Sequence, residues 1–529
     1  MTESKSGLPP FIKAMLAPAF YERPTKRVDL VQTHISFVLL TDDTVYKLKK
    51  AVRFSFLDFS TVTLRHHFCR EEVRLNRRLA PDIYDGVVAV VPDGDSFALA
   101  DESDPRAVEY AVVMRRLPAD RILASLLMQD EVTEEMIDSI SRRLVDFHQK
   151  ADAGPEVRES GNPARILKSM DDDFTEMEPF RGRTITAADD EAIVRYCRTQ
   201  LERFSGLLER RRALDKVREG HGDLHAEHIC LTDPLVIFDC IEFNRDFRCR
   251  DVAAEIAFLA MDLEYRGHPQ LSQLFLRCYA EESEDSDVLV LAPLFKAHRA
   301  YIRGKVDSLK SGEAEVGQQE RQDAVASARR HFELAYRYTW SEVRCLVVVS
   351  GLSGSGKSTV ARELHRRTGF AHFNSDVIRK QLAGVPLTSR ERARDDAGLY
   401  SSEHSARTYN RMLSLAAEEL KAGRSAIVDA TFLRRADRDA ARAVAGASKV
   451  PVVFVECWCE PVATMRRLKA RATEGNDPSD ADEDIYRQQR AAYEVFASEE
   501  QPERIGVDTS ASLAGVVDSV ERAIRDRVV

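Results

Sequence analysis

One run of residues constrains the fold of this chain more than any other. Residues 351–359 read GLSGSGKST, which contains the full pattern G-x-x-x-x-G-K-[ST]. An apolar run that begins at Cys345 precedes it, and an amphipathic stretch with Val360 and Leu364 follows it. A glycine-rich loop between a buried strand and a helix is the setting that this pattern requires. The sequence therefore predicts a phosphate-binding loop (P-loop) in an α/β domain.

Each part of this loop has a chemical task in nucleotide binding. The glycines let backbone N–H groups turn inward around an anion, and the following helix adds the positive end of its dipole. Lys357 is expected to reach the β- and γ-phosphates, and the Ser358 hydroxyl to hold Mg²⁺. We therefore expect ATP and Mg²⁺ as cofactors. The residues expected to bind the nucleotide are Gly351, Ser353, Gly354, Ser355, Gly356, Lys357, Ser358 and Thr359.

Two aspartates follow strand-like runs further along the chain. Asp429 ends an apolar run, in the place of a carboxylate that orients Mg²⁺ directly or through water. Asp376 follows a second such run and opens a helix, where it could accept the proton of a substrate hydroxyl as general base. The alternatives are that Asp376 only caps its helix and that Asp429 is a solvated strand end.

Arginines beyond Asp429 could offset the charge on a transferring phosphoryl group, because a guanidinium stays ionised and forks to two oxygens. The candidates are Arg434, Arg435, Arg438, Arg466, Arg467 and Arg471. A solvated helix face is the alternative for each of them. Residues 472–484 are acidic and rich in small side chains, which is typical of a mobile lid tip.

These motifs together resemble a group of small kinases. With GLSGSGKST, the NSD run that ends at Asp376 and the IVDATF run that contains Asp429, residues 343–529 resemble P-loop kinases of the gluconate kinase, polynucleotide kinase and zeta-toxin kind. The resemblance implies transfer of the ATP γ-phosphoryl group to a small-molecule or nucleic-acid hydroxyl. It also implies that Asp376 contacts the acceptor and that Arg467 or Arg471 belongs to the lid. It implies no particular substrate, because the group is chemically diverse.

The length of 529 residues exceeds one hydrophobic core, because cores stop growing near roughly 250–300 residues. Apolar strand-like runs alternate with helical stretches from Cys345 onward, as in a parallel α/β sheet. We therefore predict an α/β multidomain protein with a boundary near residue 341. The first domain would span 1–340, and a P-loop NTPase domain with a parallel sheet flanked by helices would span 341–529.

The first domain is expected to have two lobes. Residues about 25–115 are rich in strand patterns, including a hairpin around a turn at 41–44, and residues about 118–340 are mostly helical. The helical part contains the run HGDLHAEH at 221–228, and a short apolar run that ends at Asp239 follows. An acid in each run suits phosphoryl transfer, because one can orient the acceptor hydroxyl and the other can bind Mg²⁺.

This arrangement resembles the aminoglycoside phosphotransferase and choline kinase family, eukaryotic-kinase-like enzymes with an H-G-D-x-H-x-x-N loop and a later I-D-[FW]. The match covers roughly residues 25–310. It implies a two-lobed, protein-kinase-like α+β fold in which Asp223 accepts or orients the substrate hydroxyl and Asp239 binds the metal. The whole chain would then be a bifunctional fusion of two ATP-dependent phosphotransferases.

Further parts of such a site occur in the expected order. Alternation places Lys47 and Lys49 on one strand face, and one of them would pair with the α- and β-phosphates. Lys49 is favoured, with Glu72 as its helix partner and Glu71 as the alternative. Each lysine could instead be a surface residue. The run from Tyr110 to Leu117 is similar to the hinge strand that meets adenine in this family.

One residue departs from the family's pattern, because the metal-ligating Asn is His228 here. Mg²⁺ prefers hard oxygen ligands, and an imidazole nitrogen is a poor substitute. The outcomes are one-metal activity through Asp239 with help from Glu242, use of a softer metal such as Mn²⁺, or ligand binding without turnover. The histidines of the HGDLHAEH run could alternatively hold zinc. We expect Asp251 and Glu255 to anchor the loop.

The amino-acid composition limits the classes of molecule that this protein is expected to bind. A formal net charge of −10 provides no positive field that would favour nucleic acid or an anionic membrane. Nine scattered cysteines without a CxxC pair fit reduced thiols, and no apolar run nears the roughly 20 residues of a membrane span. We expect a soluble, cytoplasmic protein that binds ATP and a hydroxyl-bearing small molecule. The alternatives are a nucleic-acid end kinase and a P-loop kinase regulated by a pseudokinase-like, ligand-binding N-terminal half.

Overall fold

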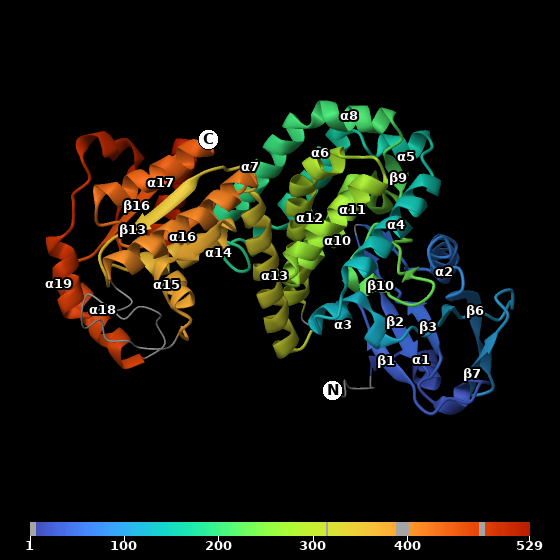
Figure 1. The fold of residues 1–529 in the computed structure, drawn as a ribbon. Coiled ribbons are helices and arrows are strands. Elements are labelled where there is room, and N and C mark those ends of the chain that lie inside the picture. Colours follow the sequence, from blue (N-terminus) through green and yellow to red (C-terminus); the bar gives the residue numbers. More distant parts are fainter. Residues whose placement is uncertain (1–6, 55, 314–315, 388–400, 475–481, 529) are drawn as a thin grey trace. The chain divides into compact units, whose positions relative to one another are not determined.

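The chain divides into two compact units in a computed structural model, Met1–Ala335 and Tyr336–Val529 (Figure 1). The division falls inside α13 (Gln318–Tyr338), slightly before the predicted boundary at 341. The structure describes residues 7–54, 56–313, 316–387, 401–474 and 482–528, apart from the side chains of 402 and 471–474. No helix within these ranges is long and apolar enough to cross a membrane.

The N-terminal unit begins with a six-stranded antiparallel sheet of order β1-β2-β3-β8-β6-β7. Its strands are β1 (Asp29–Gln32), β2 (Ser36–Leu40), β3 (Thr44–Lys49), β6 (Tyr84–Asp93), β7 (Ser96–Ala100) and β8 (Glu109–Arg115). The predicted hairpin is present as β2 and β3. The edge strands β1 and β7 have no fully buried side chain, and Leu30, Phe97 and Leu99 are only partly buried against the core.

The two faces of this sheet are covered by different helices. Helix α2 (Val62–Asn76) packs against β3, β6 and β8, and helix α1 (Pro10–Met15) packs against β7. The core beneath α2 includes Val45, Cys69, Val73, Val112 and Met114. The core beneath α1 includes Ile12, Met15, Phe37, Leu39 and Leu48. Because side chains alternate along β3, Lys47 and Lys49 share the face of Val45 and point toward α2.

The rest of the N-terminal unit is mostly helical and is built around α10 (Val252–Tyr265). Every side chain of α10 from Val252 to Leu263 is buried. It packs against α11 (Pro269–Glu282) and α12 (Asp287–Gly312), and α4 (Glu134–Lys150) packs against α11. The remaining helices are α3 (Leu123–Met128), α5 (Pro155–Glu159), α6 (Pro163–Glu176), α7 (Ala187–Arg203), α8 (Ser205–Ala213) and α9 (Arg245–Arg248). Which known fold this unit shares stays a prediction.

Two short antiparallel pairs of strands flank the HGDLHAEH run. The strand just before the run, β9 (Val217–Glu219), pairs with β12 (Cys249–Asp251), which comes later in the chain. The strand just after the run, β10 (Ile229–Cys230), pairs with β11 (Val236–Ile237). The run itself ends in a single 3₁₀ turn, η5 (Ala226–His228). Asp239 comes just after β11, so the two pairs bring both predicted acids to one end of the helical part.

The C-terminal unit is a five-stranded parallel sheet of order β14-β15-β13-β16-β17. Its strands are β13 (Leu346–Ser350), β14 (Ala371–Asn374), β15 (Ala426–Asp429), β16 (Val452–Trp458) and β17 (Arg504–Asp508). Helices α14 (Lys357–Thr368) and α20 (Leu513–Val528) cover one face, and α16 (Ser402–Lys421) and α17 (Arg435–Ala447) cover the other (Figure 1). The predicted α/β architecture with a parallel sheet flanked by helices is confirmed.

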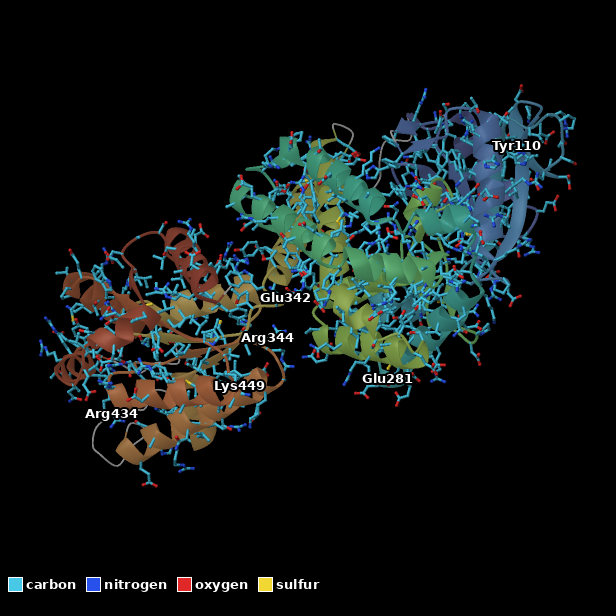
Figure 2. The ribbon with its side chains drawn as sticks, turned by 90° about the horizontal axis from the view of Figure 1, so that it is seen from above. Tyr110, Glu281, Glu342, Arg344, Arg434 and Lys449 are labelled. Carbon is cyan, nitrogen blue, oxygen red and sulfur yellow. The ribbon has the colours of Figure 1, made fainter. Side chains whose placement is uncertain are left out.

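One candidate arginine stabilises this fold instead of facing a substrate. Arg438 is fully buried, and its Nε and Nη2 donate to the two carboxylate oxygens of Glu500 at 2.9 and 3.0 Å. Its guanidinium also lies over the Phe496 ring. Arg434 is exposed by contrast, and it pairs with Asp437 at 2.9 Å at the surface of the unit (Figure 2).

Removing Arg438 should therefore destabilise the C-terminal unit. Breaking a buried ion pair costs about 3–5 kcal/mol, and the buried Glu500 would keep only its pair with Arg442 at 2.8 Å, whereas an exposed pair contributes about 1 kcal/mol or less. Both tryptophans of the chain, Trp340 and Trp458, lie in this unit, so tryptophan fluorescence during urea unfolding of the full chain reports its stability. We expect Arg438→Ala to lower the free energy of unfolding by about 3–5 kcal/mol. The matched Arg434→Ala should change it little, and equal losses would contradict this assignment.

Candidate functional site

The P-loop joins the end of β13 to the start of α14. Gly351, Gly354 and Gly356 have φ angles of 139°, 79° and 85°, which residues with a side chain rarely adopt. A Cβ on Gly351 would lie 2.3 Å from the Cys457 carbonyl oxygen, and one on Gly356 would lie 3.1 Å from Thr509 Oγ1. Backbone angle and space therefore both require glycine in this loop. The result is a tight turn of backbone at a helix N-terminus, as anion binding requires.

Asp429 lies at the end of β15, beside the strand that leads into the P-loop. Its side chain is fully buried, so the alternative of a solvated strand end is wrong. Its Oδ2 accepts a hydrogen bond from Asn374 Nδ2 at 2.6 Å and lies 3.5 Å from His372 Nε2. Its Oδ1 has no hydrogen-bond partner among the described residues.

The charge of Asp429 follows from its neighbours. Burial raises its pKa, but His372, the Lys357 ammonium and the Ser358 hydroxyl together lower the pKa below its usual value. The carboxylate is therefore ionised at neutral pH, and it keeps one buried oxygen without a protein donor. An ionised oxygen beside the Ser358 hydroxyl fits the oxygen ligands that Mg²⁺ prefers.

Asp376 lies in the first turn of α15 (Ser375–Ala383). The cap of this helix is Asn374, whose Oδ1 accepts hydrogen bonds from the N–H groups of Asp376 and Val377 at 3.0 and 3.1 Å. The alternative that Asp376 caps its helix is therefore wrong. Its Oδ1 accepts a hydrogen bond from Arg379 at 2.6 Å. Because Asn374 is paired in register with Asp429, Asp376 follows the same edge of the sheet.

Arg467, in α18 (Pro461–Glu474), lies against the P-loop. Its Nη1 donates to the Thr509 hydroxyl at 2.9 Å and its Nη2 to the Thr509 carbonyl at 2.7 Å. Its Nη1 is also 3.1 Å from the place that a Cβ on Gly356 would occupy. Arg467 is thus fixed at the base of the loop. The Arg471 side chain, and most of the lid tip predicted at 472–484, lie outside the described residues.

One side chain that sequence reasoning missed reaches the P-loop. Gln489, in α19 (Glu483–Ala491), accepts a hydrogen bond from the Ser353 N–H through its Oε1 at 2.9 Å. Backbone N–H groups of this loop are the donors that a phosphate would use. Gln489 therefore contacts one of these donors. No motif in the sequence marks this residue.

In the N-terminal unit, both lysines of β3 reach Glu72 of α2. Lys49 Nζ lies 2.7 Å from Glu72 Oε2, is also bonded to Glu242, and is almost fully enclosed. Lys47 Nζ lies 2.8 Å from Glu72 Oε1 and 2.5 Å from Asp239 Oδ1. Lys47 is thus the lysine that faces the predicted metal-binding acid. Lys49, which the sequence favours for the phosphate contact, pairs with Glu242 instead of Asp239, and which lysine contacts a phosphate stays a prediction.

The two lysines favour the ionised form of Glu72. Burial raises the pKa of Glu72, but Lys47 and Lys49 outweigh it and lower that pKa below its usual value. Glu71, the alternative helix partner, forms its ion pair with Arg74 on the same helix instead. The structure thus brings together Lys47, Glu72 and Asp239 and leaves Glu71 outside.

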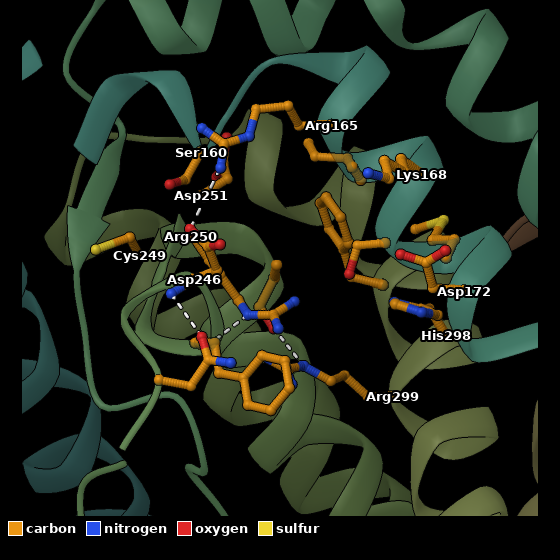
Figure 3. A pocket seen from close by; sticks show the side chains of 17 residues that line it. Ser160, Arg165, Lys168, Asp172, Asp246, Cys249, Arg250, Asp251, His298 and Arg299 are labelled. Carbon is orange, nitrogen blue, oxygen red and sulfur yellow. Dashed lines mark hydrogen bonds and ion pairs between the residues drawn. The ribbon is translucent and has the colours of Figure 1, made fainter. Parts of the chain in front are cut away.

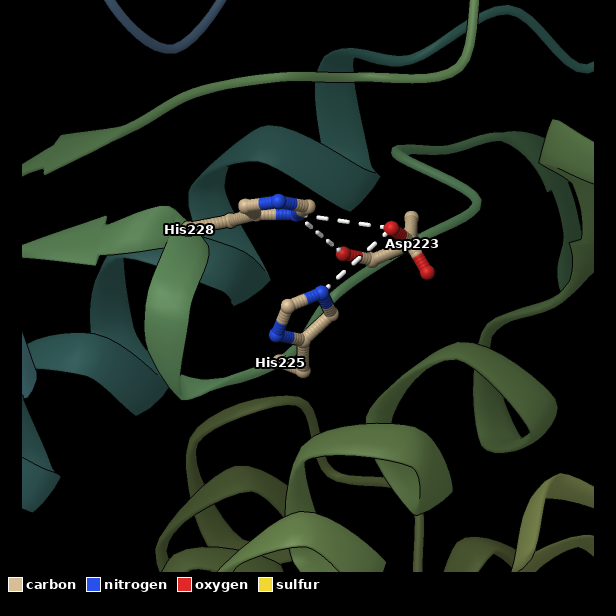
Figure 4. A group of neighbouring side chains, drawn as sticks. All are labelled: Asp223, His225 and His228. Carbon is tan, nitrogen blue, oxygen red and sulfur yellow. Dashed lines mark hydrogen bonds and ion pairs between the residues drawn. The ribbon is translucent and has the colours of Figure 1, made fainter. Parts of the chain in front are cut away.

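Asp223 lies between β9 and η5 with two histidines around it (Figure 4). Its Oδ2 is 3.4 Å from His225 Nε2 and 3.6 Å from His228 Nδ1. Burial opposes ionisation of Asp223, but the positive charge of His225 and a hydrogen bond from it hold the pKa of Asp223 well below the usual range. An ionised carboxylate here can orient a hydroxyl group or accept its proton.

His228, at the predicted metal position, is neutral and has a defined tautomer. Its Nδ1 lies 2.9 Å from the Asp223 carbonyl oxygen, which can only accept, so Nδ1 carries the proton. Burial and the neighbouring His225 lower the His228 pKa to about 4. Its Nε2 therefore has a free lone pair, and this atom lies 3.5 Å from Asp239 Oδ2. A lone pair that faces a carboxylate fits a cation held between them.

The structure does not gather all the histidines of the HGDLHAEH run. His221 Nε2 donates to the Phe238 carbonyl at 2.8 Å, and its Nδ1 accepts the Asp223 N–H at 3.3 Å. Among the described residues, Asp223, His225 and His228 form the one group of three or more His, Cys, Asp or Glu side chains whose ligand atoms all lie within 4.8 Å of one another. A zinc site would therefore lack the third histidine that the sequence suggested.

Glu255 anchors this loop from α10. Its carboxylate accepts the N–H groups of His221 at 2.9 Å and Gly222 at 3.3 Å, and lies 3.0 Å from His148 Nε2. Burial alone would raise its pKa, but His148 and the other donors lower it to about 2. Asp251 caps α10 by accepting the Ala253 N–H at 2.8 Å. Glu255 thus holds the loop in place, as expected, whereas Asp251 bonds to its own helix and to Arg211.

Sequence comparison relates the chain to mycobacterial proteins. It is 30% identical over 455 residues to the uncharacterized protein Rv2004c of Mycobacterium tuberculosis (strain H37Rv), covering 85% of this chain and 87% of that protein. The uncharacterized protein Mb2027c of Mycobacterium bovis matches to the same extent. The chain belongs to their family. A family model described as an AAA domain matches residues 346–496, which include the P-loop, Asp376 and Asp429.

Solved kinase structures match about a third of the chain. A sugar kinase from Janibacter sp. is 18% identical and has a TM-score of 0.28, with 35% of this chain and 95% of that chain covered. A gluconokinase from Sinorhizobium meliloti is 21% identical and has a TM-score of 0.25, with 35% and 94% covered. TM-scores this low do not establish a shared fold. The P-loop class of the C-terminal unit rests on its parallel sheet, its loop and the family model.

The P-loop glycines allow a test of steric demand separate from backbone strain. Gly384, at the end of α15, has a φ of 69° but nothing within 4 Å of its added Cβ. We expect Gly384→Ala to cost about 1–2 kcal/mol, the usual cost of left-handed backbone. Gly351→Ala should cost about 3 kcal/mol or more, because its Cβ would also displace the backbone of β16. Urea unfolding followed by tryptophan fluorescence measures both free energies of unfolding. Equal losses in the two variants would contradict the steric crowding inferred at Gly351.

Proposed function

We propose that the C-terminal unit is an ATP- and Mg²⁺-dependent kinase that transfers the γ-phosphoryl group to a hydroxyl of a small molecule. The observation that supports it most is Asp429, a buried ionised carboxylate with an unpartnered oxygen beside the P-loop. Lys357 would contact the β- and γ-phosphates, and Ser358 and Asp429 would hold the metal. Bound Mg²⁺ would neutralise charge on the triphosphate.

Asp376 would act on the acceptor side of this kinase. Its bond to Arg379 orients one carboxylate oxygen, and the other can accept the proton of the attacking hydroxyl. The hydroxyl oxygen would then bond to the γ-phosphorus as the bond to ADP breaks. Arg467, fixed at the base of the P-loop, would offset charge on the phosphates. The net charge of −10 favours a small acceptor over a polynucleotide.

A second candidate function is a phosphotransferase activity of the N-terminal unit, of the aminoglycoside phosphotransferase and choline kinase type. The contact of Lys47 with both Glu72 and Asp239 favours it, because these are the parts that such an enzyme needs in one place. Asp223 would orient the acceptor hydroxyl, and Asp239 and His228 would hold the metal. An imidazole ligand favours a softer ion such as Mn²⁺. The chain would then be bifunctional.

The P-loop lysine tests the first of these functions. Lys357→Ala removes the side-chain cation from the phosphate site, and we expect ATP turnover in an Asp223→Asn background to fall by roughly 100-fold or more. ADP release by the full chain with a panel of hydroxyl compounds measures it. Lys421→Ala, which removes an exposed lysine at the end of α16, is the matched control. Unchanged turnover in Lys357→Ala would overturn the assignment.

Acceptor screening tests whether both units are catalytic. Full-length Asp223→Asn, Lys357→Ala and the double variant would be incubated with ATP and sugars, aminoglycosides, nucleosides or oligonucleotides. Phosphoryl transfer adds about 80 Da to an acceptor, which mass spectrometry detects. We expect each single variant to keep one class of product and the double variant to keep none.

The same screen separates the alternatives. If only Lys357→Ala removes product, the N-terminal unit is not a phosphotransferase, and the pseudokinase-like alternative holds. If oligonucleotides are the acceptors that gain mass, the C-terminal unit is an end kinase instead.

A further inference from the structure

The helical part of the N-terminal unit contains a pocket of about 300 Å³ (Figure 3). It lies between α6, the segment around β12, α10 and α12, and none of the residues predicted for catalysis, nucleotide or metal lines it. Its volume is at the lower end of small-molecule sites, which span about 300–1,000 Å³. Four cationic side chains line it, namely Arg165, Lys168, Arg250 and Arg299.

Arg299 is a buried cation whose hydrogen bonds are incomplete. It extends from α12, is 4% exposed, and lies over the Phe258 ring. Its Nε donates to the Ala254 carbonyl at 3.4 Å, but its buried Nη2 has no hydrogen-bond partner within the described part of the chain. A buried charged donor left unpaired costs about 1–3 kcal/mol or more. The pocket therefore presents an unmatched guanidinium N–H.

Arg250, from β12, brings a second positive charge to the same place (Figure 3). Its Nε donates to the Phe247 carbonyl at 2.6 Å. Among the described residues, no carboxylate lies within ion-pair distance of Arg250 or Arg299. Burial and the charge of Arg250 lower the pKa of Arg299 to about 9. Asp223, Glu255 and Asp173 oppose this shift from beyond ion-pair distance, and two adjacent cations without a directly paired carboxylate would be stabilised by an anion between them.

The acids that line the pocket do not cancel this charge. Asp251 forms an ion pair with Arg211, and both of its carboxylate oxygens accept hydrogen bonds from that arginine at 2.8 Å. Asp246 is exposed and pairs with Arg165 at 3.4 Å, and Asp172 is also exposed. The pocket thus combines buried or half-buried arginines with acids that are either neutralised or at its rim.

We propose that this pocket binds the oxyanion group of a small metabolite, with Arg250 and Arg299 as its charged donors. A phosphate and a carboxylate share the required chemistry, because both present two oxygens to a guanidinium fork. The exposed Arg165 and Lys168 at the rim would attract such an anion. Binding there requires no turnover at either proposed active site.

Isothermal titration calorimetry on the full chain, with excess MgADP present to occupy the P-loop, tests this site. The probes are inorganic phosphate and acetate as the two oxyanions, with tetramethylammonium as the cation control. We expect at least one oxyanion to bind with an affinity in the millimolar range or tighter. Arg299→Gln should weaken it by roughly 10-fold or more, the effect of losing one hydrogen bond to a charged group.

Three further variants provide a second test of the arginines, a variant with the opposite expected effect and a control. Arg250→Gln, at a half-buried position, repeats the test if Arg299→Gln fails to fold. Asp246→Asn should strengthen oxyanion binding, because it removes a negative charge that competes for Arg165. Arg210→Gln, which removes a surface pair with Asp287 away from the pocket, should leave it unchanged.

Each outcome decides the proposal. Phosphate binding without acetate binding, lost in the arginine variants, assigns a phosphate-bearing ligand, and the reverse assigns a carboxylate. Absence of oxyanion binding, oxyanion binding equal in the arginine variants and the unmodified chain, or preference for tetramethylammonium would overturn it. None of these outcomes depends on whether Lys357→Ala abolishes turnover.

Discussion

The buried carboxylate of Asp429 is the constraint on which the C-terminal unit depends. An ionised group without solvent is unfavourable unless positive charge and donors surround it. Here His372 and Asn374 come from the neighbouring strand β14, and Lys357 and Ser358 come from the helix after β13. Parallel pairing of β15 with both strands brings these groups to one edge. The parallel pairing of β15 with β13 and β14 therefore produces both the order of these strands and the group of side chains at the proposed metal site.

In the N-terminal unit, a larger set of opposite charges stabilises buried ionised side chains. Lys47 and Lys49 are held inside by Glu72, Asp239 and Glu242, which come from a helix and from loops of the helical part. Removing Lys47 would take its lysine partner from Asp239, and removing Lys49 would take its lysine partner from the buried Glu242, which is unfavourable. This network joins the strand part to the helical part at the predicted phosphate site. It therefore stabilises the unit and fixes the positions of the groups that would act on a nucleotide.

The sequence allowed prediction of features that depend on short runs. The P-loop, the strands ending at Ser350 and Asp429, and the hairpin of β2 and β3 each follow from local spacing, and the structure has them. Contacts between distant segments left no such pattern. Neither Gln489 on the loop nor the preference of Asp239 for Lys47 over Lys49 could be seen, because alternation places both lysines on one face and only packing separates them. Arg438 resembled a surface arginine until its partner, distant in sequence, was known.

The pocket of the helical part illustrates why net charge is a poor guide to small ligands, although it still bears on long polyanions. A chain with a formal charge of −10 repels anions at long range, yet solvent screens that field within about 10 Å. Inside the pocket the local groups decide, and there the acids are bound by Arg211 or lie at the rim. Two arginines with few competing acceptors then outweigh the acidity of the whole chain. The same reasoning applies to the P-loop, where backbone N–H groups and one lysine make an anion site in an acidic protein.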